Sequence, residues 1–196
     1  MMQAGQWVDL ARESMLQPRK AARAILAMHV PVAMLIEFLV LAAVLADLFL
    51  QASLQLGGPT TDFFMASGMP GPVGMAVLQF FALIAMAVSI LFVGRVFGGT
   101  GDWAGALALV CWLQTILLAL QFGQIVLALV LPPASDILGL VSIVALFWLL
   151  THFVAELHGF THPWLVFLMV VITTVILMFS LSFALVATGI LVPGAA

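Results

Sequence analysis

Residues 164–191 read WLVFLMVVITTVILMFSLSFALVATGIL and contain no charged side chain. A helix needs about 20 apolar residues to cross the ~30 Å hydrocarbon core of a bilayer, so this stretch is long enough to span it. A strand of a membrane barrel would instead alternate polar and apolar residues over about 10 positions. Because this stretch does not alternate, it predicts a transmembrane helix.

Composition extends this prediction to the whole chain. Hydrophobic residues make up 65% of the 196 residues and charged residues 7%, and the mean hydropathy is +1.32. Soluble domains carry roughly 25% charged residues, and this chain is too short to bury several long apolar runs away from water. We therefore predict an integral membrane protein. Its single cysteine, Cys111, excludes an intrachain disulfide and a multi-cysteine metal site.

Four further apolar runs precede the quoted one, and turn-forming residues separate all five. The predicted spans are Val30–Leu50, Val73–Val93, Trp103–Leu131, Ile137–Ala155 and Trp164–Leu191. A cleaved signal peptide, ending at the VLA before Asp47, is the alternative interpretation of the first run.

Residues at the ends of these runs are typical of helix boundaries. Pro31 and Pro163 lie near helix starts, while Asp102 and Asp136 occupy positions typical of N-caps. The predicted fold is all-α, a bundle of five transmembrane helices. We expect a cytoplasmic amphipathic segment in residues 1–29, the five-helix domain in residues 30–192 and a short non-cytoplasmic tail in residues 193–196.

The basic residues predict the orientation of this bundle. Arg12, Arg19, Lys20 and Arg23 precede the first span and Arg95 ends the second, so alternation of the spans puts all five on one side. Cytoplasmic loops of membrane proteins carry the excess of lysine and arginine. The N-terminus is therefore expected in the cytoplasm and the C-terminus on the other side, as in a multi-pass protein of a bacterial inner membrane.

The first 29 residues predict two short interfacial helices separated at Pro18. Arg19, Lys20 and Arg23 form a basic group that fits a docking surface for anionic lipid or a cytoplasmic partner, at about 1 kcal/mol per basic residue near an anionic membrane. The alternative is an anchor that only fixes the direction of insertion. We expect the lipid bilayer as a partner, and no nucleic acid.

Charged groups within the membrane usually pair or have a function, because each costs about 2.5–3.5 kcal/mol on insertion scales. Glu37, Arg95, His152 and Glu156 all fall near the cytoplasmic end of a predicted span. We expect an intramembrane polar cluster on this side, in which Arg95 neutralises Glu37 or Glu156.

A second polar group falls near the opposite ends of the spans. It consists of Asp47, Gln79, Gln121 and Gln124. Such glutamines commonly form hydrogen bonds between helices. A proton or small-solute conduit from Asp47 to Glu37 is a further hypothesis, although the two acids lie about 80° apart around an ideal helix.

FVAELHGFTHPW, residues 153–164, is the richest stretch in titratable side chains, and His152 precedes it. Gly159 and Pro163 predict that a helix stops inside it, which separates His158 from His162. A metal site would need three or four converging ligands, and no matching spacing is present. Metal binding and a pH-sensitive histidine remain lesser alternatives to an interfacial loop. We expect no catalytic residue, no metal ion and no cofactor.

Two blocks carry a family resemblance: FVGRVFGGTGDWAGALALVCWLQTILLALQFGQIVLALVLPP at residues 92–133 and LFWLLTHFVAELHGFTHPWLVFLMVVITTVILM at residues 146–178. They resemble the bacterial branch of the Yip1 family, over roughly residues 15–190. The resemblance implies five helices, a cytoplasmic N-terminus and a non-cytoplasmic C-terminus. Eukaryotic relatives associate with Rab-type GTPases through a long N-terminal region and a DLYGP-like motif. This chain has no tyrosine for such a motif, and for prokaryotic members the family implies a fold without an established activity.

Three functional hypotheses follow. The first is a non-catalytic, membrane-organising scaffold that holds partner proteins or lipids with its helix faces and its basic N-terminal segment. The second is a small transporter or proton conduit through Glu37, Asp47, Arg95 and Glu156. The third is an accessory subunit of a larger membrane complex. The stretches GMAVLQFFALIAMA and ATGILVPG contain no strict G-x-x-x-G pattern, so they do not indicate strong dimerisation through that motif, and the oligomeric state stays open.

Overall fold

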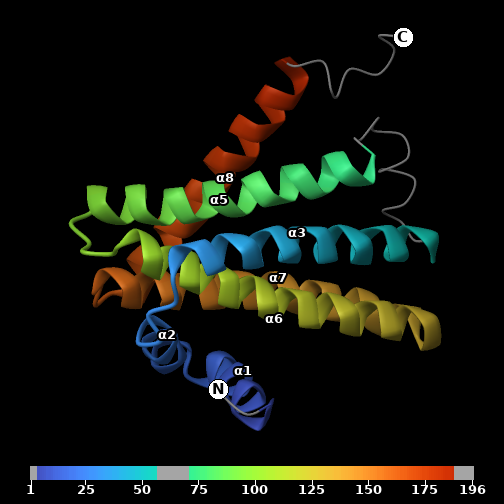
Figure 1. Cartoon of the computed structure of the whole chain (residues 1–196), viewed down its shortest axis with the longest axis horizontal. Coiled ribbons are helices and arrows are strands. Elements are labelled where there is room, and N and C mark those ends of the chain that lie inside the picture. Colours follow the sequence, from blue (N-terminus) through green and yellow to red (C-terminus); the bar gives the residue numbers. More distant parts are fainter. Residues whose placement is uncertain (1–3, 57–70, 188–196) are drawn as a thin grey trace.

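The computed structural model of the chain describes residues 4–56 and 71–187 (Figure 1). Within these two ranges the backbone forms seven helices and no strand, which confirms the all-α prediction. Two short helices come first, α1 (Ala4–Leu16) and α2 (Pro18–Leu26). The five long helices are α3 (Val32–Gln55), α5 (Pro72–Val96), α6 (Trp103–Val130), α7 (Pro132–His158) and α8 (Pro163–Ala187).

Each of the five long helices is long and apolar enough to cross a membrane. The five predicted spans are therefore confirmed, with differences at their ends. The largest occur at Gln55, to which α3 continues beyond Leu50, and at Pro132, where α7 begins ahead of Ile137. Helices continue through such polar ends because hydrogen bonding within the helix satisfies the backbone wherever water is scarce. The loop at 57–70, residues 188–191 of the last predicted span and the tail at 193–196 lie outside the described residues.

The helix ends confirm one predicted cap and correct another. Asp102 is the N-cap of α6, and its carboxylate accepts a hydrogen bond from the backbone N–H of Gly105 at 3.3 Å. Asp136 is not a cap, because α7 already begins at Pro132 with Leu131 at the N-cap position. The prolines that open α7 preset the helical φ angle and lack an N–H that would need a partner.

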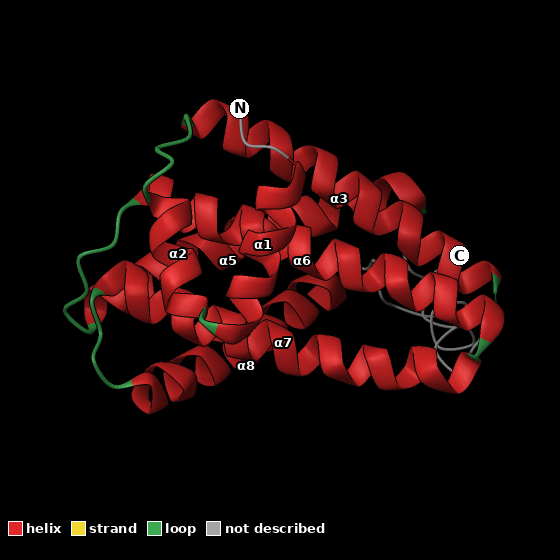
Figure 2. Cartoon of the chain, turned by 90° about the horizontal axis from the view of Figure 1, so that it is seen from below, coloured by secondary structure: helices red, strands yellow, loops and turns green. Residues whose placement is uncertain are grey.

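The first half of α6 is the centre of the bundle. All residues from Gly105 to Gln114 are buried, so this half is covered on every side. Helices α3, α5 and α7 pack around it, and α2 lies against it as well. Helix α1, which lies towards the viewer in Figure 2, contacts α6 at Trp112. Further along, Phe122, Leu129 and Val130 are exposed, as lipid-facing side chains are expected to be.

One end of the bundle gathers the parts of the chain that are richest in polar side chains. There α2, the last turn of α5, the first turn of α6 and the last turn of α7 meet, at the left of Figure 1. We call this the basic end, since all five lysine and arginine residues lie in α1, α2 or the last turn of α5. From this end α8 runs away at a steep angle to the other spans (Figure 1).

Candidate functional site

The two N-terminal helices form a hairpin fixed to the bundle through its apolar side. On α2 the residues Pro18, Ala21, Ala22 and Ile25 are buried. Helix α2 packs on both α6 and α7. The predicted break between the two helices at Pro18 is confirmed, since α2 begins at this residue.

The contact of α1 with α6 centres on a tryptophan. Trp112 Nε1 donates a hydrogen bond to Ser14 Oγ at 2.8 Å, and Ser14 Oγ in turn donates to the Leu10 carbonyl at 2.8 Å. The rings of Trp7 and Trp112 lie 5.7 Å apart. Ser14 is fully buried, so its two hydrogen bonds must be satisfied within the protein. They therefore specify where α1 sits on α6.

The opposite side of α2 presents the three predicted basic residues. Arg19 donates to the backbone carbonyl of Phe160, in the turn between α7 and α8, at 2.9 Å. Lys20 forms an ion pair with Glu13 of α1, and Arg23 forms one with Glu156 of α7 at 3.3 Å. The side chains of Lys20 and Arg23 nevertheless stay 62% and 67% exposed. The pairs therefore orient these cations without removing them from the surface, and exposed pairs of this kind contribute only about 0–1 kcal/mol to stability.

The structure corrects the predicted pairing inside the cluster on this side. Arg95 donates to the Gly101 carbonyl at 3.4 Å, whereas Glu156 is paired with Arg23. The prediction that Arg95 neutralises Glu37 or Glu156 is therefore wrong. It considered only charges on the spans, and the cation that reaches Glu156 comes from the hairpin folded back onto α7.

The other two members of this cluster also have separate surroundings. Glu37 lies on the exposed side of α3, and His152 donates to the Trp148 carbonyl of its own helix at 2.8 Å. Within residues 4–56 and 71–187, no hydrogen bond or ion pair joins any two of Glu37, Arg95, His152 and Glu156.

A histidine that the sequence argument did not include among the site residues is tightly packed at the basic end. His158 is 3% exposed, and its Nε2 donates to the Ile90 carbonyl of α5 at 3.1 Å. Side chains added at Gly94, Gly99 or Gly101 would meet its ring, with a Cβ at Gly94 only 1.6 Å from Nε2. These three of the four glycines in GRVFGGTGDW thus form a socket for the ring. The closely spaced glycines were the one sequence signal of this socket. Nothing near them in the sequence indicates which distant side chain packs there.

The polar residues near the other end tie helices together. Gln121 donates to the Ala46 carbonyl of α3 at 3.4 Å, and Gln124 donates to Ser142 Oγ of α7 at 2.9 Å. Asp47 is buried and accepts from Gln51 of the same helix at 3.4 Å. Interhelical bonds of this kind contribute about 0.6–2 kcal/mol each in membranes.

Gln79, the fourth predicted member, is half-buried on α5 and has no hydrogen bond to any residue of the described ranges. Asp47 is buried and Glu37 exposed on the same helix, so the two acids of the conduit hypothesis face different surroundings.

The arrangement of five spans behind a basic hairpin agrees with a known protein family. A family model described as the Yip1 domain matches residues 12–184. The chain belongs to the Yip1 family. The match begins within α1 and includes α2 and the five candidate spans, so the family domain covers α2 and the end of α1. No curated protein and no solved structure matches the chain.

This Yip1-domain protein is a multi-pass membrane protein, and two of the cavities among its described residues bear on function. One, of about 210 Å³, lies at the basic end beside His29, Asp102 and Leu157. The other, of about 410 Å³, is a crevice between α5, α7 and α8. No group of three or more histidine, cysteine or acidic side chains that could hold a metal ion occurs within the described ranges.

Proposed function

We propose that this Yip1-domain protein is a non-catalytic, membrane-organising scaffold that binds anionic lipid headgroups with its N-terminal hairpin. The observation that carries the proposal is the division of α2 into two sides. One side is buried against α6 and α7, and the other presents Arg19, Lys20 and Arg23. A helix held in this way presents its cations in a fixed array, so little side-chain and backbone freedom is lost on binding.

The electrostatics of an anionic membrane support the same proposal. Basic residues beside such a membrane contribute about 1 kcal/mol each and act within a Debye length of its surface. Lys20 and Arg23 already share their charge with Glu13 and Glu156, so we expect less than the full sum. A contribution of about 1.4 kcal/mol corresponds to a tenfold preference for anionic over zwitterionic lipid. The basic end then faces the cytoplasm, as the distribution of lysine and arginine predicts.

The experiment compares lipid preference in charge variants of the full chain. The protein is reconstituted into nanodiscs of mixed phosphatidylglycerol and phosphatidylcholine, and the lipids retained on gentle extraction are counted by native mass spectrometry. The triple variant R19E/K20E/R23E should lose most of the preference for phosphatidylglycerol. The matched control R19K/R23K keeps every charge and should retain it.

Two outcomes would contradict the proposal. An unchanged lipid preference in R19E/K20E/R23E would show that the hairpin does not select anionic headgroups. The second outcome is a protein that co-purifies in mild detergent with the natural chain and not with this variant, while the lipid preference of the variant is unchanged. The hairpin would then be a protein-docking surface. The four residues of the conduit hypothesis have separate surroundings, so no observation favours that function.

A further inference from the structure

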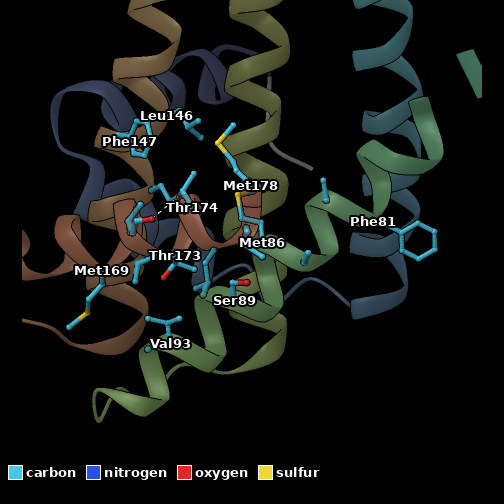
Figure 3. Close-up of a pocket in the computed structure, with 18 of the residues that line it drawn as sticks. Phe81, Met86, Ser89, Val93, Leu146, Phe147, Met169, Thr173, Thr174 and Met178 are labelled. Carbon is cyan, nitrogen blue, oxygen red and sulfur yellow. Dashed lines mark hydrogen bonds between the residues drawn. The ribbon is translucent and has the colours of Figure 1, made fainter. Parts of the chain in front are cut away.

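The crevice between α5, α7 and α8 has a volume of about 410 Å³. Figure 3 shows its walls: Ser89 and Val93 come from α5, Leu146 from α7, and Thr173 from α8. Almost the whole lining is hydrocarbon. Thr174 uses its hydroxyl to bond the Val170 carbonyl of its own helix at 2.8 Å, so this polar group requires no ligand.

The direction of α8 explains why these helices leave a space. Helix α8 packs mainly on α7 and makes little contact with α5. Figure 1 shows it crossing the direction of α5 instead of running beside it. On α5 the facing positions include the small residues Ala82, Ala85 and Ser89, which do not fill the gap. All three helices cross the membrane, so the crevice lies at the depth of the lipid tails.

The size of the crevice indicates whether a transmembrane helix or a lipid acyl chain fits it better. A helix is about 10–12 Å wide, and even ten residues of one occupy roughly 1,200 Å³, so a partner helix fits the crevice less well than a narrower chain does. A hydrocarbon chain has a width near the ~4 Å contact distance of carbon atoms, and over the ~15 Å of one leaflet it occupies roughly 200 Å³. The crevice therefore fits one or two lipid tails.

A cation lies beside the end of the crevice that is nearest the basic end. Phe160, in the turn between α7 and α8, lines the crevice together with Val93 and Gly94. The carbonyl of this same Phe160 accepts the hydrogen bond from Arg19. A guanidinium has five N–H donors, so Arg19 keeps further donors for a phosphate. Basic groups between transmembrane helices on the cytoplasmic side are suited to anionic headgroups.

We propose that the crevice between α5, α7 and α8 binds an acyl chain of an anionic phospholipid whose phosphate lies at Arg19. The contact with the phosphate rests on the proposed function, whereas the tail site does not. Lipid tails elsewhere are equally apolar, so this site is distinguished from the surrounding bilayer by the fit of a chain into a preformed space. Such a lipid would fill the gap that α8 leaves and join the hairpin to the last span.

The experiment maps where lipid tails contact the protein. The full chain is reconstituted into nanodiscs that contain a little phosphatidylglycerol with a photoreactive diazirine midway along one acyl chain. After irradiation and digestion, mass spectrometry locates the labelled residues. We expect labelling concentrated on the walls of the crevice. The variant A85W fills the crevice and should lower that labelling by about tenfold, equivalent to ~1.4 kcal/mol. T173F fills it from α8 and provides a second test should A85W fail to fold.

The matched control is V88W, because Val88 is 48% exposed on α5 and does not line the crevice. It should leave crevice labelling unchanged. Equal labelling of the crevice and of the exposed side of α5, with no effect of A85W or T173F, would overturn the tail site. Capture of a protein by a photoreactive residue placed at position 173 in cells would also overturn it.

The phosphate contact has its own test, which separates the two proposals. In R19Q, crevice labelling by phosphatidylglycerol should fall towards the level obtained with phosphatidylcholine. Specific labelling of the crevice that is equally strong for both lipids, in R19Q and in the natural chain, would overturn the phosphate contact and leave the tail site supported. R19E/K20E/R23E provides the same separation. If this variant loses the lipid preference but its crevice is still labelled, and A85W still lowers that labelling, the tail site does not depend on the headgroup site of the hairpin.

Discussion

Replacing Gly94 with alanine should destabilise the protein because the new methyl group meets the His158 ring. The added Cβ would lie 1.6 Å from Nε2, so the ring must leave its socket. Crowding a packed interior costs about 1–3 kcal/mol, and losing the hydrogen bond to Ile90 costs about 0.5–1.5 kcal/mol. Alanine returns up to about 1 kcal/mol as the better helix former. The net cost is therefore about 0.5–3.5 kcal/mol, which corresponds to a fall in Tm of roughly 2–10 °C for a chain of this size.

The assay is thermal unfolding of the purified chain in detergent, followed by size-exclusion chromatography after heating. Gly139→Ala is the matched control, because its Cβ would meet only Gln124 Oε1 at an ordinary 3.7 Å. Its Tm should stay the same or rise. The decisive comparison is Gly94→Ala in a His158→Ala background, where the obstacle is gone and the alanine should cost nothing. An equal fall in Tm in both backgrounds would refute the socket, since the damage would then come from something other than the ring.

Three further predictions test the ends of the helices, the seat of the hairpin and the topology. Asp102→Ala should cost about 0.5–2 kcal/mol through loss of the α6 cap, measured as a lower Tm, whereas Asp136→Ala should change Tm little because that residue caps nothing. Trp112→Phe removes the hydrogen bond to the serine of α1, at about 1 kcal/mol; trypsin should then cut the hairpin faster, and an unchanged rate would show that this bond does not hold it. Cysteines placed at Val8 and at Leu131 should react with impermeant reagents from opposite faces of sealed vesicles, and labelling from the same face would contradict the topology.

The number and kind of the spans could be predicted from the sequence because lipid leaves the backbone few choices. An apolar run of about 20 residues in a bilayer must satisfy its own hydrogen bonds, and a helix does so within the run itself. The break at Pro18 and the cap at Asp102 were predictable for a different reason, because both depend only on neighbours in the chain. The match to the Yip1 domain over residues 12–184 confirms the resemblance that the two sequence blocks carry.

The partners of the polar side chains could not be predicted, because they depend on segments far apart in the sequence. Arg23 and Glu156 meet only because the hairpin folds back onto the end of α7. Depth along a span gives no information on rotation around the bundle, so four residues at one depth do not have to meet. The prediction for Asp136 failed for a local reason: a pair of prolines at Pro132 can begin a helix without any capping side chain.

The length of α6 accounts for the depth at which the hairpin lies. Its 28 residues extend about 42 Å at 1.5 Å per residue, some 12 Å more than the ~30 Å hydrocarbon core. If this excess projects at the basic end, Trp112, about 13 Å along the helix, lies at the boundary between hydrocarbon and headgroups. Tryptophan is enriched at this level, and Trp112 and Trp7 contact each other there. In that arrangement the projecting part of α6 would hold the hairpin among the headgroups, with the cations of α2 at the depth of lipid phosphates.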